Sequence, residues 1–205
     1  MSEYWIGIDD HYAWANLVSV TTFGPDERLL DRRRVELLDQ SLAASPYHHD
    51  TLHMSLSLAE ELVREVQASA SSRAISALSS LLADLAPATC RGIAIRVPPL
   101  PELPATIAEA HANAWVTNRA DGMIYHQALT SAAAQLNLRV FDFEKATVLA
   151  DAAEARGTTA RDLERRLKDF ATICGRPWNK AHVLACAGAI LAHASALPVA
   201  PELGR

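Results

Sequence analysis

The stretch Tyr4-Trp5-Ile6-Gly7-Ile8-Asp9-Asp10 decides the fold, because an apolar run ends there in two carboxylates. Its apolar part, with Gly7 inside it, predicts a central strand over residues 4–8. Carboxylates at a strand tip are well placed to hold a divalent cation. If both acids lie in the strand, they point to opposite faces, so we expect Asp9 to be the ligand and Asp10 a turn or cap residue.

Further strands are expected on both sides of a helical middle section. Residues 15–22 predict a second strand that ends at the turn signal Phe23-Gly24-Pro25-Asp26. Residues 28–38 fit a third, edge strand or a short helix, and three strands joined by tight turns would form an antiparallel meander. Two later strands are predicted at residues 91–97 and 138–143.

Helices are expected between and after these strands. Asp50 or Thr51 is predicted to cap a helix that loosens at 69–72 and resumes at 75–85. The remaining helical predictions are 105–136 with a kink at Asp121-Gly122, several segments after 145, and a final helix over 178–195. The order βββαβαβα predicts one α/β domain over residues 1–197, a mixed sheet with helices on both faces, and residues 198–205 as a frayed tail.

Composition narrows the classes of protein. Half of the 205 residues are hydrophobic and the net charge is −5, which favours a packed core and argues against avid nucleic-acid binding. The charge is uneven, with four Lys/Arg against ten Asp/Glu in residues 1–60 and nine against six in residues 145–205. A basic C-terminal face therefore remains available for a phosphate backbone.

The cysteines and the hydrophobic runs indicate the cellular compartment in which we expect the protein. Cys90, Cys174 and Cys186 are odd in number and form no CxxC pair, which is typical of reduced thiols in a cytoplasmic protein. We expect no signal peptide and no membrane span. The chain also lacks a phosphate-binding glycine loop, a dinucleotide fingerprint and a GxSxG elbow, which excludes those enzyme classes.

The C-terminal half resembles the RuvC-type Holliday-junction resolvases of the ribonuclease H-like superfamily. The resemblance lies in an order of elements: a strand, a glycine-marked helix, a strand followed by a lysine, and a polar-tipped last helix. Here these are Gly92-Ile93-Ala94-Ile95-Arg96-Val97, then Arg119-Ala120-Asp121-Gly122 through Leu136, then Leu138–Lys145, then Asn179–Ala185. The resemblance implies the ribonuclease H-like fold, with three antiparallel strands followed by parallel ones.

In that family, four acidic or histidine residues bind two Mg²⁺ ions for phosphodiester hydrolysis. Asp9 matches the first-strand carboxylate, Asn179 an Asp or His, and His182 the last Asp, while Arg96 stands at the second carboxylate. The resemblance thus implies Asp9 and His182 as catalytic residues and Asp9, Asn179 and His182 as ligands of Mg²⁺ or Mn²⁺. By itself, the Asp9 and His182 pair fits either a one-metal site or a general acid/base pair. His11, beside Asp9, is a further candidate for the site, but a loop histidine is more often solvated, and that is the expectation here.

Other polar groups have both a functional and a structural interpretation. His48, His49 and His53 form the densest histidine group, which suits either a metal or a solvated helix start. Glu102 is a candidate for the missing carboxylate. Candidate phosphate contacts are the basic residues Lys145, Arg161 and Lys180, although interleaved acids near Arg161 also fit a helix of surface ion pairs.

Two functions follow from the sequence. The first is a divalent-metal-dependent endonuclease of the RuvC-like type acting on structured DNA or RNA. The alternative is a catalytically inactive ribonuclease H-like module for binding or assembly, favoured by Arg96 at a ligand position. DNA or RNA is the candidate partner, and we expect no membrane association. Alanines along residues 105–136 permit close helix packing, either within the chain or across a homodimer.

Overall fold

The computed structural model describes residues 2–23 and 26–196, so the predicted tail at 198–205 lies outside the described residues. Its centre is a five-stranded sheet in the order β3-β2-β1-β4-β5. The strands are β1 (Glu3–His11), β2 (Trp14–Phe23), β3 (Asp26–Glu36), β4 (Thr89–Arg96) and β5 (Arg139–Phe143). β1, β2 and β3 pair antiparallel, whereas β4 runs parallel to β1 and β5 runs parallel to β4. The predicted mixed sheet is confirmed, and residues 26–36 form the edge strand rather than a helix.

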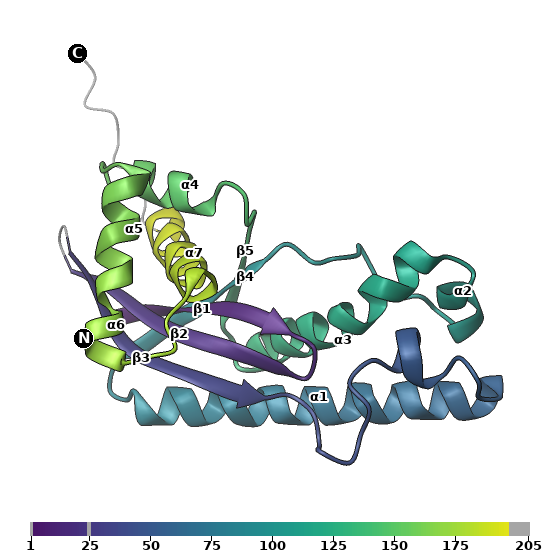
Figure 1. Cartoon of the computed structure of the whole chain (residues 1–205). Coiled ribbons are helices and arrows are strands. Elements are labelled where there is room, and N and C mark those ends of the chain that lie inside the picture. Colours follow the sequence, from purple (N-terminus) through teal and green to yellow (C-terminus); the bar gives the residue numbers. More distant parts are fainter. Residues whose placement is uncertain (1, 24–25, 197–205) are drawn as a thin grey trace, which may run out of the picture.

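Helices cover both faces of the sheet, as predicted (Figure 1). On one face, α1 (Leu56–Asp84) and α3 (Ala114–Gln135) pack on Tyr4, Ile6, Ile8 and their neighbours. On the other face lie α4 (Val148–Ala155), α5 (Ala160–Asp169) and α7 (Lys180–Ala196), packed on Trp5, Val18, Val20 and Phe143. The remaining short elements are the π-helical turn η1 (Pro46–Asp50), α2 (Ile107–His111) and α6 (Ala171–Cys174). None of the helices within the described residues is long and apolar enough to span a membrane.

The helix α7 lies close against β1, and Gly7 makes this possible. A Cβ atom on Gly7 would overlap the backbone carbonyl of Ala185. The absence of a side chain at this point therefore lets the helix backbone approach the strand directly. As a result, the N-terminal half of α7 passes beside the end of β1 where the carboxylates lie.

Helix α1 is one continuous helix, so the predicted loosening at residues 69–72 is wrong. Ala70 and Ala74 are fully buried and continue the apolar stripe of the helix between Val66 and Leu78. Because small buried residues keep the stripe unbroken, the serines beside them do not end the helix. Its start is also later than predicted, since Ser55 is the N-cap and residues 46–50 form the π-helical turn instead.

The predicted helix over residues 105–136 is two helices, and its expected kink lies elsewhere. The chain breaks between α2 and α3 at Asn113, whose Oδ1 accepts a hydrogen bond from the Trp115 backbone N–H at 2.9 Å. This is an N-cap, which favours a new helix start. Helix α3 then runs without interruption through Asp121 and Gly122. Its buried alanines pack within the chain against α1 and the sheet.

Candidate functional site

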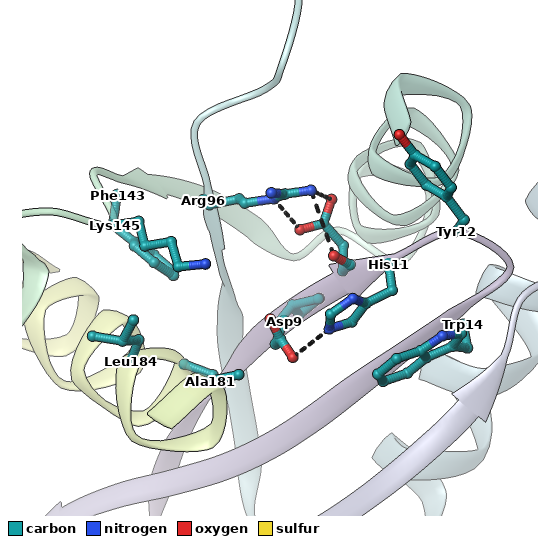
Figure 2. Close-up of a pocket in the computed structure, with 12 residues that line it drawn as sticks. Asp9, His11, Tyr12, Trp14, Arg96, Phe143, Lys145, Ala181 and Leu184 are labelled. Carbon is teal, nitrogen blue, oxygen red and sulfur yellow. Dashed lines mark hydrogen bonds and ion pairs between the residues drawn. The ribbon is translucent and has the colours of Figure 1, made fainter. Parts of the chain in front are cut away.

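A pocket of about 430 Å³ opens where β1 and β4 end (Figure 2). Because β1, β4 and β5 are parallel, their carboxyl ends meet at one edge of the sheet, where α/β proteins commonly bind ligands. The first turns of α7 form one wall. The polar and aromatic residues that line the pocket are Asp9, Asp10, His11, Tyr12, Trp14, Arg96, Phe143 and Lys145.

Asp9 faces the pocket from the side of the sheet that α7 covers. Its Oδ2 accepts hydrogen bonds from His11 Nε2 at 2.8 Å and from Asn16 Nδ2 at 3.1 Å. No hydrogen bond among residues 2–23 and 26–196 uses its Oδ1. The His11 ring also stacks on Trp14, with ring centroids 3.9 Å apart. His11 is therefore held in place by Asp9 and Trp14, which the expectation of a merely solvated loop histidine missed.

Asp10 points to the other face of the sheet and is almost completely buried. Arg96 donates to it, with Nε 2.7 Å from Oδ1, and His126 Nδ1 on α3 lies 3.6 Å from Oδ2. The side chain of Asp10 is 1% exposed, whereas that of Arg96 is 38% exposed and reaches into the pocket (Figure 2). Burial alone would raise the pKa of Asp10, but His126 and Arg96 together hold it below its usual value.

The ion pair with Asp10 fixes the position of the Arg96 guanidinium. Its guanidinium lies at the position where the resemblance places a second carboxylate, and its partner is Asp10 rather than Asp9. Asp10 is thus a buried ion-pair partner and not a turn or cap residue. The positive charge of Arg96 remains at the pocket wall.

Asn179 and His182 lie together at the start of α7, but they bond to each other. Asn179 Oδ1 accepts from the backbone N–H of Ala181 at 2.9 Å and is also 2.9 Å from His182 Nδ1. The His182 ring is buried and stacks on Trp178, with centroids 5.1 Å apart. Its Nε2 is buried without a hydrogen-bond partner among the described residues.

The electrostatic surroundings keep His182 neutral. Burial and the charge of Arg32 lower its pKa, while Asp9 acts in the opposite sense. His182 Nδ1 lies within hydrogen-bonding distance of both Asn179 Oδ1, at 2.9 Å, and the Asn179 backbone N–H, at 3.3 Å, so the ring can pair with Asn179 in either tautomer. His182 is not among the residues that line the pocket. Its present contacts are those of a residue that fixes the first turn of α7.

The residues present do not fit the two-ion arrangement that the resemblance implies. The part of the chain that the structure describes contains no group of three or more His, Cys, Asp or Glu side chains placed to hold a metal ion. Asp9 offers one carboxylate oxygen, Arg96 brings a positive charge, and the Asn179 oxygen is already used as a helix cap. Glu102 lines a different pocket, beside Trp115, and does not replace the missing carboxylate.

The backbone of η1, which contains His48 and His49, binds a buried carboxylate. Asp121 on α3 is fully buried and accepts from the backbone N–H groups of Tyr47 at 2.8 Å and His48 at 3.2 Å. Burial raises its pKa to about 6, although these two hydrogen bonds act against the shift. The ring centroids of His48 and His49 lie 4.0 Å apart. Asp121 therefore ties η1 to α3, a role that the sequence did not reveal.

Of the predicted phosphate contacts, only Lys145 lines the pocket. Lys180 is exposed at the first residue of α7, and Arg161 is exposed on α5. The neighbours of Arg161 on α5 pair with acids, Arg165 with Asp162 at 2.6 Å and Lys168 with Glu164 at 2.7 Å, as the predicted surface ion pairs would. The positive charge available at the pocket therefore comes from Lys145 and Arg96.

Of three comparisons with known proteins, the comparison with solved structures shows the fold. No protein-family model matches the chain, and no curated protein matches it in sequence. The structure is similar to that of Thermus thermophilus RuvC, with a TM-score of 0.53 at 13% identity over 94% of this chain and 95% of that one. It is also similar to T. thermophilus RuvC in complex with a Holliday junction substrate, with a TM-score of 0.52 at 13% identity over 95% and 94% of the two chains. The chain has the RuvC-like form of the ribonuclease H-like fold over nearly its whole length.

Proposed function

We propose that this protein binds nucleic acid, and that the pocket at the ends of β1 and β4 takes up a backbone phosphate without two-metal cleavage. The observation that carries the proposal is Arg96, whose guanidinium is fixed at the pocket wall by the buried Asp10. An arginine held in this way offers its remaining N–H donors to a phosphate at little entropic cost. Lys145 supplies a second positive charge to the same pocket.

Two further features support a phosphate ligand. The N-terminal part of α7 forms a wall of the pocket, and the N-terminus of a helix carries a partial positive charge. In addition, one of the similar solved structures is a complex with a Holliday junction, which makes structured DNA the first ligand to test. The fold is the only property that this chain has been found to share with that protein.

The second candidate is a metal-dependent endonuclease, and Asp9 is the observation that favours it. Its Oδ1 is not used by any hydrogen bond in the described part of the chain, and its side chain borders the pocket. A carboxylate oxygen is a suitable ligand for Mg²⁺ or Mn²⁺. His182 and Asn179 would have to give up their mutual hydrogen bond to join Asp9 in such a site.

One experiment separates the two candidates. Fluorescence anisotropy would measure binding of labelled four-way-junction, duplex and single-stranded DNA at several salt concentrations, and gel analysis would follow cleavage with Mg²⁺ or Mn²⁺. We expect binding that weakens with salt, since phosphate contacts release counterions, and no cleavage. Lys145→Gln should weaken binding to all three DNAs, whereas the control Arg165→Gln, on the exposed face of α5, should not.

Cleavage would decide in favour of the second candidate. If wild-type protein cuts DNA with either metal ion and Asp9→Asn does not, the protein is an endonuclease despite Arg96. If wild-type protein neither binds nor cuts DNA or RNA at low salt, both candidates are refuted.

A further inference from the structure

A strip of exposed aromatic and basic side chains leads away from the pocket along α3. It begins at Tyr12, in the turn between β1 and β2, which lines the pocket and is 43% exposed. The Tyr12 hydroxyl donates to the backbone carbonyl of Asn118 at 2.8 Å, and its ring lies over Gly122, where a Cβ would be 3.1 Å from Cε1. The ring is therefore held on the surface of α3 with one side open to solvent.

The same face of α3 carries the rest of the strip. Trp115, Arg119 and Gly122 are spaced by four and three residues, so they follow one another along one side of the helix. Trp115 is 52% exposed, and the Arg119 guanidinium carbon lies 4.2 Å from the centroid of its ring. Tyr12, Arg119 and Trp115 together define the strip.

The charges of the strip continue those of the pocket. Burial raises the pKa of Tyr12, with Asp121 acting in the same direction, while the charges of Arg96 and Arg119 lower it. Both guanidinium groups are therefore close enough to act on the Tyr12 hydroxyl. The two positive charges in the pocket, Lys145 and Arg96, are thus followed outwards by the Tyr12 ring, the Arg119 charge and the Trp115 ring.

We propose that this strip binds single-stranded nucleic acid, with unpaired bases stacked on Tyr12 and Trp115 and phosphates near Arg119 and the pocket. Proteins that bind single strands combine such aromatic platforms with basic grooves. Trp115 and Gly122 are seven residues apart, which corresponds to about 10 Å along the helix. The inference rests on the proposed function and adds that the pocket is entered by an unpaired strand.

The geometry of the Tyr12 and Trp115 rings also favours base stacking. The Tyr12 ring is oriented by its hydroxyl and by Gly122, and Trp115 is oriented by Arg119. A ring that is already ordered loses little freedom when a base stacks on it. Bases within a duplex are already stacked on one another and offer no free face, so the strip should discriminate against duplex.

The test compares one short oligonucleotide, single-stranded and as a duplex, by fluorescence anisotropy. Trp115→Ala should weaken binding of the single strand about fivefold or more, the low end for the loss of one base–aromatic stack, and should leave duplex binding unchanged. Tyr12→Ala should act in the same way, whereas Tyr12→Phe keeps the ring and its contact with Gly122 and should retain most of the binding. Ile173→Ala, which removes a 70% exposed side chain from α6, is the matched control and should have no effect.

Each result decides a different question. If Trp115→Ala and Tyr12→Ala bind the single strand as tightly as wild type while Lys145→Gln weakens all DNA binding, the strip is refuted and the proposed function stands. Equal losses for single strand and duplex would also refute base stacking. If wild-type protein binds no nucleic acid at low salt, the strip and the proposed function fail together. Because Trp115 is exposed and on the helix surface, its variant should melt as the wild type does, which keeps the test independent of folding.

Discussion

Removing the Arg96 guanidinium should leave the Asp10 carboxylate buried without its main cationic partner. Arg96→Met keeps the apolar stem of the side chain and removes the charge. Breaking a fully buried ion pair costs about 3–5 kcal/mol of unfolding free energy. Here Arg96 is 38% exposed and His126 stays 3.6 Å from Asp10, so we expect a smaller loss of about 2–3 kcal/mol at neutral pH. For a domain of this size that corresponds to a fall in Tm of about 4–12 °C.

The pH dependence gives the sharper test of this reasoning. In the wild type the pKa of Asp10 is lowered, so its contribution to stability is present above the unfolded value and is lost as pH falls through the folded value. Without Arg96, burial dominates and the folded pKa should rise above the unfolded value of about 4. The variant should then lose stability as pH rises. The difference in unfolding free energy between wild type and variant should therefore be small near about pH 4 and reach its largest value at neutral pH.

Urea unfolding of wild type, Arg96→Met and Asp10→Asn/Arg96→Met across that pH range would measure these changes. The double variant should be more stable than Arg96→Met at neutral pH, because it no longer buries an unpaired charge. Arg165→Met, which removes a largely exposed pair with Asp162, serves as the control and should change little. A deficit that is the same at all pH values, or a double variant no more stable than Arg96→Met, would refute the role given to the buried pair.

Three further predictions concern the scaffold around the site. Asp121→Asn should flatten the pH dependence of stability between about pH 4 and 6. In the wild type the pKa of Asp121 is raised to about 6, so the protein loses stability as pH rises through that window. Urea unfolding midpoints would measure the change, and the same pH dependence in both proteins would contradict it. Gly7→Ala should cost about 3 kcal/mol or more, since its Cβ would overlap the Ala185 backbone, and thermal melting close to wild type would disprove this contact. Asn179→Ala should cost about 1–2 kcal/mol by removing the α7 cap, whereas Asn179→Asp should largely retain it; equal melting of the two variants would argue against capping.

The sequence by itself determined the elements whose signals are short-range. The apolar run of β1 with its terminal carboxylates and the β-branched run of β2 both depend on neighbouring residues, and the structure has these strands where predicted. From the order of these elements the mixed sheet with helices on both faces followed. The same local signals failed for α1 and α3, because buried alanines kept α1 whole and the Asn113 cap divided the second helical region.

What only the tertiary structure decided is which groups meet at the pocket. The two-residue period of a strand places Asp9 and Asp10 on opposite faces of the sheet, but it does not say which of them pairs with a basic side chain. That choice depends on Arg96, 86 residues away along the chain, and on His126, which α3 brings to the face of the sheet where Asp10 points. Tyr12 meets Asn118 across 106 residues in the same way. Such contacts are set by how the helices pack on the sheet, and no pattern of neighbouring residues encodes them.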